Sequence, residues 1–260
     1  MIITLTTDFG LVDPFVAIMK GVILGIAPNA QLVDVTHEIG SYDIVEAALL
    51  LDSSYRYFPE GTIHVIVVDP GVGSERRPMA AAANGHIFVA PDNGVLSLVL
   101  KGNATAPQVY HITNESLFRN PVSNTFHGRD IFAPVAAHLA RKTPIEAVGP
   151  RIVDFVKKPL PKPRPRGGRL VGVVLRIDKF GNVITNLRRE NLPSDFSIKV
   201  AGLSITRLCS SFSEAESGEF FAIEGSSVFI ELALNQGSAA EKLNVGRGEE
   251  IELETGRPNQ

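Results

Sequence analysis

Residues 65–77 read Val-Ile-Val-Val-Asp-Pro-Gly-Val-Gly-Ser-Glu-Arg-Arg, and this stretch decides the fold that the sequence predicts. Its first four residues are β-branched and apolar, the pattern of a strand buried on both faces of a parallel sheet. Asp69 then stands at the carboxyl end of that strand, where open α/β sheets bind ligands. The Pro-Gly pair turns the chain at once, so Arg76 or Arg77 can return towards the carboxylate. Taken alone, the pattern also fits a strand end with a surface ion pair.

The segments before this strand alternate between strand and helix patterns. Ile2–Thr6 and Leu32–Val35 are expected to be strands. Apolar residues at helical spacing predict one helix with Asp13 as its N-cap and a second helix over 43–57. Strand-helix-strand-helix-strand order implies a mostly parallel, Rossmann-like sheet with right-handed crossovers. After it, Asn84-Gly85 between two apolar runs predicts a β-hairpin.

A basic, proline-rich stretch divides the chain. Residues 157–168 read Lys-Lys-Pro-Leu-Pro-Lys-Pro-Arg-Pro-Arg-Gly-Gly. We expect a semi-rigid linker over 158–168 that forms neither helix nor sheet. It separates an α/β domain at 1–157 from a domain at 169–260 whose short strand patterns predict an all-β, antiparallel, barrel-like fold.

Composition limits the class of protein. The chain has 260 residues, with 44% hydrophobic and 20% charged side chains, which is typical of a soluble globular protein. The net charge of -3 argues against a nucleic-acid partner. One cysteine excludes an intrachain disulfide, and the histidines lack metal-ligand spacing, so no metal is expected. Because the start lacks a basic signal-peptide region and no apolar run reaches about 20 residues, we expect a cytoplasmic location and no membrane partner.

Two isolated residues of the first domain could carry chemistry. Asp8 follows the first strand, where a carboxylate can accept hydrogen bonds from both hydroxyls of a ribose, although a loop aspartate often bonds its own backbone. His127 precedes a helix, where a neutral imidazole could handle a water proton, although a structural role competes. The sequence has no glycine-rich phosphate-binding motif, which favours a nucleoside without a phosphate chain.

In the second domain, Asp178–Asn186 is dense in polar groups for a β segment. A hairpin turn would explain its glycine. It would not explain an acid and two amides around an aromatic ring, a set that suits an adenine or amino-acid pocket.

Five motifs occur in a specific order along nearly the whole chain. They are Thr7–Gly10, Asp69–Gly73 with Arg76-Arg77, Pro91–Gly94, Thr125–Asp130 and Asp178–Asn182. Together they resemble the S-adenosyl-L-methionine hydroxide adenosyltransferase family, relatives of the fluorinating and chlorinating enzymes. The resemblance implies that water or hydroxide attacks C5′ of the adenosyl group and displaces methionine, with no cofactor. It also implies a homotrimer with sites between the first domain of one subunit and the second domain of its neighbour.

The same resemblance implies roles for individual residues. Asp69, Arg76 and His127 match a triad that orients and activates water, with Arg77 as a rival for the arginine. The implied substrate-binding residues are Asp8 for the ribose, Tyr42 for stacking, Phe126 for the wall of the C5′ pocket, Asp178 for the methionine amine, Asn182 for adenine, and Asn93, Ser226 and Asn235 as further contacts.

Departures from the halogenating relatives favour hydrolysis. Those relatives carry hydroxyl side chains where this chain has Asp69, Val72 and Gly128. A carboxylate would repel a halide in a desolvated pocket. A halogenase of the same superfamily is the first alternative, and a nucleoside-binding protein without catalysis is the second.

Overall fold

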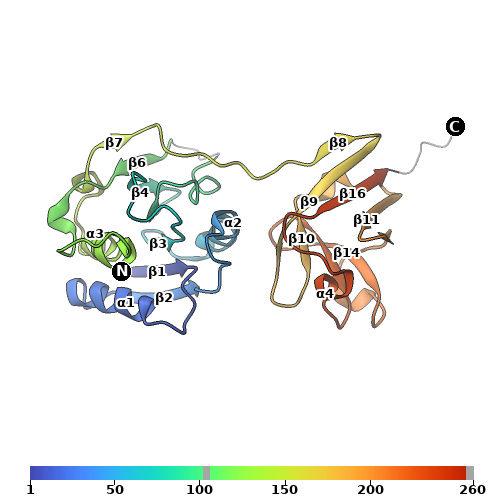
Figure 1. The fold of residues 1–260 in the computed structure, drawn as a ribbon, viewed down its shortest axis with the longest axis horizontal. Coiled ribbons are helices and arrows are strands. Elements are labelled where there is room, and N and C mark those ends of the chain that lie inside the picture. Colours follow the sequence, from blue (N-terminus) through green and yellow to red (C-terminus); the bar gives the residue numbers. More distant parts are fainter. Residues whose placement is uncertain (102–105, 256–260) are drawn as a thin grey trace. The chain divides into compact units, whose positions relative to one another are not determined.

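The computed structural model describes residues 1–101 and 106–255, which fall into two units, Met1–Pro159 and Leu160–Gln260. The apolar run at 65–68 includes the last three residues of β3 (Ile63–Val67). All residues of this strand are buried. On either side of β3, and parallel to it, lie β1 (Ile2–Thr7) and β5 (His86–Pro91). These strands form the centre of the first unit (Figure 1).

The sheet of the first unit is mixed rather than mostly parallel. Its seven strands run in the order β2-β1-β3-β5-β4-β6-β7. β2 (Gln31–Thr36) is parallel to β1. The remaining strands are β4 (Pro78–Ala83), β6 (Gln108–His111) and β7 (Arg151–Ile152). β4 is antiparallel to β5, β6 to β4, and β7 to β6. The prediction of an α/β unit is confirmed, but a mostly parallel, Rossmann-like sheet is not, because the three strand pairs beyond β5 are all antiparallel.

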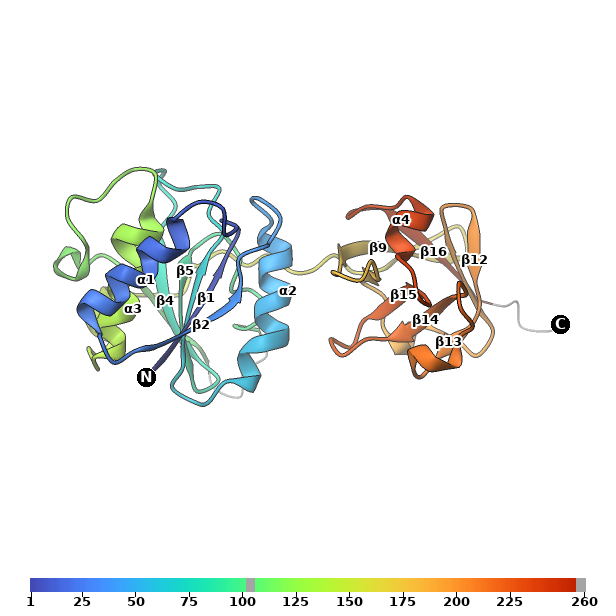
Figure 2. The same ribbon diagram turned by 90° about the horizontal axis from the view of Figure 1, so that it is seen from below.

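Helices cover both faces of this sheet (Figure 2). One face carries α1 (Phe15–Ile26) and α3 (Ala133–Ala140), and the other carries α2 (Ile44–Ser54). Asp13 is not the N-cap of α1, since the Pro14 carbonyl already accepts the first helical bond, from Ile18. The chain runs from β1 out to β2 and then back across β1 to β3. The topological switch point, where open α/β sheets bind ligands, therefore lies at the carboxyl ends of β1 and β3.

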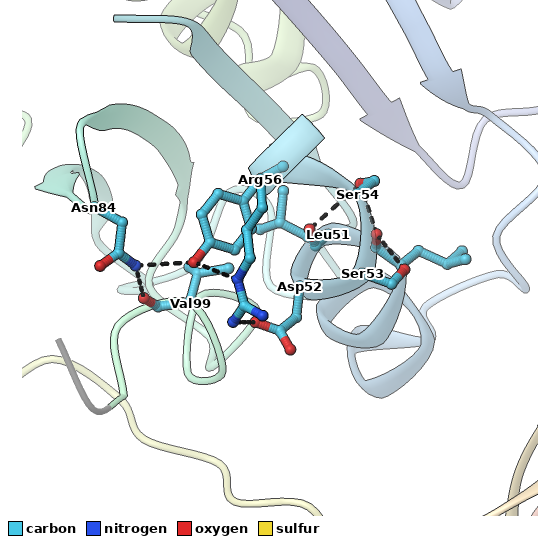
Figure 3. A network of polar contacts seen from close by, with 9 residues as sticks. Leu51, Asp52, Ser53, Ser54, Arg56, Asn84 and Val99 are labelled. Atoms are coloured by element: carbon cyan, nitrogen blue, oxygen red, sulfur yellow. Dashed lines mark hydrogen bonds and ion pairs between the residues drawn. The ribbon is translucent and has the colours of Figure 1, made fainter. Parts of the chain in front are cut away.

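The predicted hairpin is confirmed, and its asparagine also anchors the turn. Asn84 has φ 53° and Gly85 has φ 76°, the positive angles that a two-residue type I′ turn requires. Nδ2 of Asn84 donates hydrogen bonds to the Val99 carbonyl and to the Tyr55 hydroxyl. Arg56 donates to the same hydroxyl and pairs with Asp52 on α2 (Figure 3). The network therefore ties the hairpin to the end of α2.

The second unit is a curled, nine-stranded sheet in the order β12-β11-β16-β9-β10-β15-β14-β13, with β8 beside β9. Its elements are β9 (Arg169–Ile177), β10 (Val183–Thr185), β11 (Phe196–Val200), β12 (Leu203–Ile205), β13 (Leu208–Cys209), β14 (Phe220–Glu224), β15 (Ile230–Leu234), α4 (Ala239–Leu243) and β16 (Glu250–Thr255). The prediction is corrected in three respects. The barrel is open between β12 and β13, β13 is parallel to β14, and the short α-helix α4 is present.

The proline-rich stretch is not free of sheet structure. Arg164–Arg166 forms β8, which pairs antiparallel with β9. An edge strand tolerates Pro165 because only one side of the strand needs hydrogen-bond donors. Arg164 and Arg166 also form ion pairs with Glu250 and Glu252 on β16. The predicted absence of sheet over 158–168 is therefore wrong for these three residues.

No helix within residues 1–101 and 106–255 combines the length and the apolar character needed to cross a membrane.

Candidate active site

Polar side chains gather at the carboxyl ends of the parallel strands in the first unit. Asp8 follows β1, Asp69 follows β3, and Asn93 follows β5. Parallel strands present their carboxyl ends at one edge of a sheet, so these residues lie at the same edge, near the switch point between β1 and β3.

Arg76 joins Asp69 to His127. Its Nε donates to Oδ1 of Asp69 at 3.0 Å, and its Nη2 donates to Oδ2 of the same carboxylate. Nη2 also lies 3.0 Å from Nδ1 of His127. The side chains of Arg76 and Asp69 are only 7% and 5% exposed. A two-pronged, charge-assisted contact of this kind is strong and directional, so it fixes the orientation of both groups.

Gly73 brings the two loops of this contact together. It has φ 76°, and a Cβ atom here would lie 2.3 Å from the carbonyl oxygen of Asn124. Only glycine allows this turn to pack so closely against the segment that carries His127. This close approach explains how residues that are 51 positions apart come into contact. His127 directly precedes a π-helical turn, Gly128–Phe132, a feature that is frequent at functional sites.

Arg77 contacts Asp92 and Asp154 instead of Asp69. It donates from Nε to Asp92 at 3.0 Å and from Nη1 to Asp154 at 3.0 Å. Arg77 directly precedes β4, and these contacts direct its side chain away from Asp69. Arg76, and not Arg77, is the arginine that contacts Asp69.

The imidazole of His127 favours its neutral form. Burial and the adjacent Arg76 guanidinium lower its pKa, although Asp69, Asp130 and a hydrogen bond with the Ser123 backbone act in the opposite direction. Removal from water and a neighbouring cation both disfavour an imidazolium.

Asp8 lies at the same edge of the sheet and is held by a backbone group. The N–H of Tyr42 donates to Oδ2 of Asp8 at 2.8 Å. Burial raises the pKa of Asp8, the Tyr42 bond lowers it, and the negative charge of Asp69 raises it further. The carboxylates of Asp8 and Asp69 are therefore close enough to interact. The Tyr42 side chain is 69% exposed, so its ring has an open face.

Phe126 and Asn93 both make contacts within the first unit. The Phe126 ring packs edge-on against Phe9 and Phe15, with centroids at 5.9 and 5.3 Å. Asn93 donates from Nδ2 to the carbonyl of Val68 at 2.8 Å. Asn93 thus holds the end of the strand that carries Asp69, and a direct contact with substrate stays a prediction.

In the second unit, Asp178 and Asn182 form one local cluster. Oδ2 of Asp178 accepts from Nδ2 of Asn182 at 2.9 Å, and Oδ1 accepts from the backbone N–H of Phe180 and of Asn182. A cavity of about 560 Å³ lies beside this turn, lined partly by Asp178, Phe180, Ser238 and Glu241. Phe180 is 77% exposed.

Ser226 and Asn235 are separated by β15. Ser226 is exposed on the turn before this strand. Asn235 follows the strand, and its Nδ2 donates to the Ala215 carbonyl at 2.7 Å. The structure therefore does not bring these two predicted contacts together.

Sequence reasoning missed a chain of polar groups near Asp8 that runs from the buried Thr7 and His37 to the exposed Asp34. The Thr7 hydroxyl lies 2.9 Å from Nδ1 of His37, and Nε2 of His37 lies 3.1 Å from Oδ1 of Asp34. The His37 carbonyl also accepts from the N–H of Gly10 at 2.8 Å. These contacts hold the loop that carries Asp8. Their signal in the sequence was the position of Thr7 and His37 at the ends of two adjacent strands.

Among the residues that the structure describes, no group of three or more histidine, cysteine, aspartate or glutamate side chains is arranged to hold a metal ion.

Comparison with known proteins matches both parts of the chain to domains of one family. Residues 3–149 match the SAM hydroxide adenosyltransferase N-terminal domain, and residues 172–252 match the C-terminal domain of that family. An (R)-S-adenosyl-L-methionine hydrolase from Salinispora arenicola is 36% identical over 98% of both chains. A fluorinase from Actinoplanes sp. is 32% identical over 74% of this chain and 73% of its own. The crystal structure of an uncharacterized conserved protein from Thermotoga maritima has a TM-score of 0.88 at 36% identity, covering 98% of this chain and 100% of its own.

Proposed function

The chain belongs to the SAM hydroxide adenosyltransferase family, and on that premise we propose that it hydrolyses S-adenosyl-L-methionine to adenosine and L-methionine. The observation that carries the proposal is the buried contact of Arg76 with both Asp69 and His127, beside Asp8 at the carboxyl ends of two strands. This arrangement suits the binding of a water molecule next to a ribose.

In the proposed reaction, a water oxygen attacks C5′ of the adenosyl group. The C5′–S bond breaks, its electron pair passes to sulfur, and methionine leaves as a neutral thioether. Because the sulfonium is already a good leaving group, the protein mainly has to hold the water in line with that bond. Such ordering can contribute about 7–11 kcal/mol. The negative charges of Asp8 and Asp69 also suit a cationic substrate.

The substrate contacts are part of the proposal. We assign the ribose to Asp8, ring stacking to Tyr42, the C5′ wall to Phe126, the methionine amine to Asp178, adenine to Asn182, and further contacts to Asn93, Ser226 and Asn235. The exposed ring of Tyr42 and the contact between Asp178 and Asn182 support these roles. We also propose a homotrimer in the cytoplasm that requires no cofactor; mass measurement by light scattering tests the trimer.

A halide is a poor nucleophile for this site. Asp69 is 5% exposed and would repel an anion in a medium of low polarity. In addition, a Cβ atom at Gly128 would lie 3.1 Å from both the Phe126 ring and the Met19 sulfur, so a serine here would be crowded.

The test is incubation of the purified protein with S-adenosyl-L-methionine, with and without chloride. Release of adenosine that does not depend on chloride supports the hydrolase. Formation of 5′-chloroadenosine identifies a halogenase, and a stably bound, unreacted ligand identifies a binding protein. Either of the last two results rejects the proposal.

A further inference from the structure

The contact between Arg76 and His127 fixes the proton on the imidazole. A guanidinium group only donates hydrogen bonds and does not lose its proton in proteins. Nη2 of Arg76 lies 3.0 Å from Nδ1 of His127, so Nδ1 must present its lone pair. The neutral ring then carries its hydrogen on Nε2. In this tautomer Nδ1 is occupied by Arg76 and Nε2 has no lone pair to accept a proton.

We propose that His127 is a positioning residue which holds Arg76 through Nδ1, and that the carboxylate of Asp69 accepts the proton of the attacking water. The inference rests on the proposed function and assigns the roles within its site. Its direct support is the geometry of the three side chains, and the lowered pKa of His127 agrees with a ring that stays neutral.

The proton balance of the step follows from this assignment. The water oxygen forms the bond to C5′ as the C5′–S bond breaks. One water proton passes to an oxygen of Asp69, and the carboxylic acid later releases it to solvent. Each carboxylate oxygen has more than one acceptor site, so Asp69 can keep its bonds to Arg76 while it receives the proton.

Among the described residues, one nitrogen of Arg76 keeps N–H donors that are not engaged. Its Nη1 is buried and has no hydrogen-bond partner among the described residues, whereas Nε and Nη2 are both engaged. The guanidinium also lies over the Phe132 ring, with Cζ 5.4 Å from the ring centroid, which limits its movement. Nη1 therefore has N–H donors left to orient the oxygen of the nucleophile.

Two isosteric variants separate positioning from proton transfer. The Oδ1 atom of asparagine can take the place of Nδ1, so His127→Asn keeps an acceptor for Arg76 but cannot act as a base near neutral pH. His127→Leu has nearly the same shape and lacks the acceptor. We expect turnover of His127→Leu to fall about 10²-fold, as for a misplaced catalytic group. We expect His127→Asn to recover most of that loss and to keep the acid limb of the wild-type pH–rate profile. His138→Gln, on α3, is the control and should match wild type.

The opposite pattern would overturn the inference. If His127 were the base, His127→Asn would be as slow as His127→Leu, with the loss of about 10²–10⁴-fold typical of a missing general base, and the acid limb would change. A wild-type protein that releases no adenosine would instead refute the proposed function itself. The two failures are therefore distinguishable.

The tautomer can also be observed without turnover. Long-range ¹H–¹⁵N correlation spectra of the ¹⁵N-labelled full chain should show His127 with an unprotonated Nδ1 and a protonated Nε2 at neutral pH. Comparison with His127→Asn identifies the resonances. A proton on Nδ1 would contradict the inference directly.

Discussion

The backbone N–H of Tyr42 donates a hydrogen bond of 2.8 Å to the carboxylate of Asp8, and Tyr42 adopts a φ of 68° in doing so. Positive φ is uncommon for a bulky residue. The loop after β2 therefore accepts an unfavourable backbone conformation while it holds the carboxylate that follows β1. This connection ties the proposed ribose contact to the exposed ring of Tyr42.

Replacing Asp8 should separate binding from stability. Asp8→Asn removes a charged acceptor for the ribose hydroxyls, a loss of about 1.5–3 kcal/mol, or roughly 10–100-fold in adenosine affinity by calorimetric titration. The folded state raises the pKa of Asp8, so its ionisation costs stability as the pH rises. The variant should therefore melt no lower than wild type at neutral pH. Asp13→Asn, an exposed acid of the same loop, is the control. Unchanged adenosine affinity in Asp8→Asn would reject the ribose role.

The two adjacent arginines should have different phenotypes. Arg76→Gln should abolish most turnover, because it removes the link between Asp69 and His127. Arg77→Gln should instead lower the free energy of unfolding by about 1–3 kcal/mol, since the carboxyl group of Asp92 is 2% exposed and would lose its charged partner. Urea denaturation and adenosine release under the same conditions compare the two. The reverse pattern would show that Arg77 serves the reaction.

Replacing Asp69 should slow the reaction more than it weakens the binding of adenosine. Asp69→Ala should slow adenosine release by at least about 10²-fold, the usual contribution of a general base. Affinity for adenosine should change little, because the ribose contact is assigned to Asp8. Single-turnover rates and calorimetry measure the two effects. Full activity in Asp69→Ala would end the triad assignment.

A buried histidine pair should make the fold sensitive to acid. Nε2 of His64 lies 3.3 Å from Nδ1 of His86, and burial together with His86 lowers the pKa of His64 to about 3. The unfolded chain binds a proton below pH about 6.5 that the folded chain excludes, so stability is lost as the pH falls through that range. The loss is at most about 1.4 kcal/mol per pH unit for this group.

Thermal unfolding between pH about 5 and about 7 checks this expectation against the reference pKa of histidine. His64→Gln should show a shallower decline of the melting temperature towards acid than wild type. His138→Gln, at a less buried position, should decline nearly as wild type does. Parallel curves for His64→Gln and wild type would contradict the lowered pKa.

The sequence predicted those features that local patterns determine. The β-branched run at 65–68 predicted the central strand, and Asn84-Gly85 predicted the turn with two positive φ angles. The direction of strands beyond the hairpin depends on tertiary pairing, so the sheet was predicted to be more parallel than it is.

Within the candidate site, the sequence did not predict the direction in which side chains point. A pair of adjacent arginines does not show which of the two contacts Asp69, because side-chain direction depends on the backbone conformation of the turn. Likewise, the contact between Thr7 and His37 joins residues 30 positions apart and needs the register of two strands. Position after a strand therefore identified where the site lies but not the bonds within it.

Strand β8 determines where a fragment that contains only the second unit should begin. Glu250, Glu252 and Glu254 project from one face of β16, and the arginines of β8 neutralise two of them. A fragment that started at Arg169, where the sequence predicted the second domain to begin, would lose those cations and expose the edge of β9. Glu250 would then lose both of its cationic partners, while Arg169 would still pair with Glu252 and Glu254. A fragment meant for expression or labelling should accordingly begin ahead of Arg164.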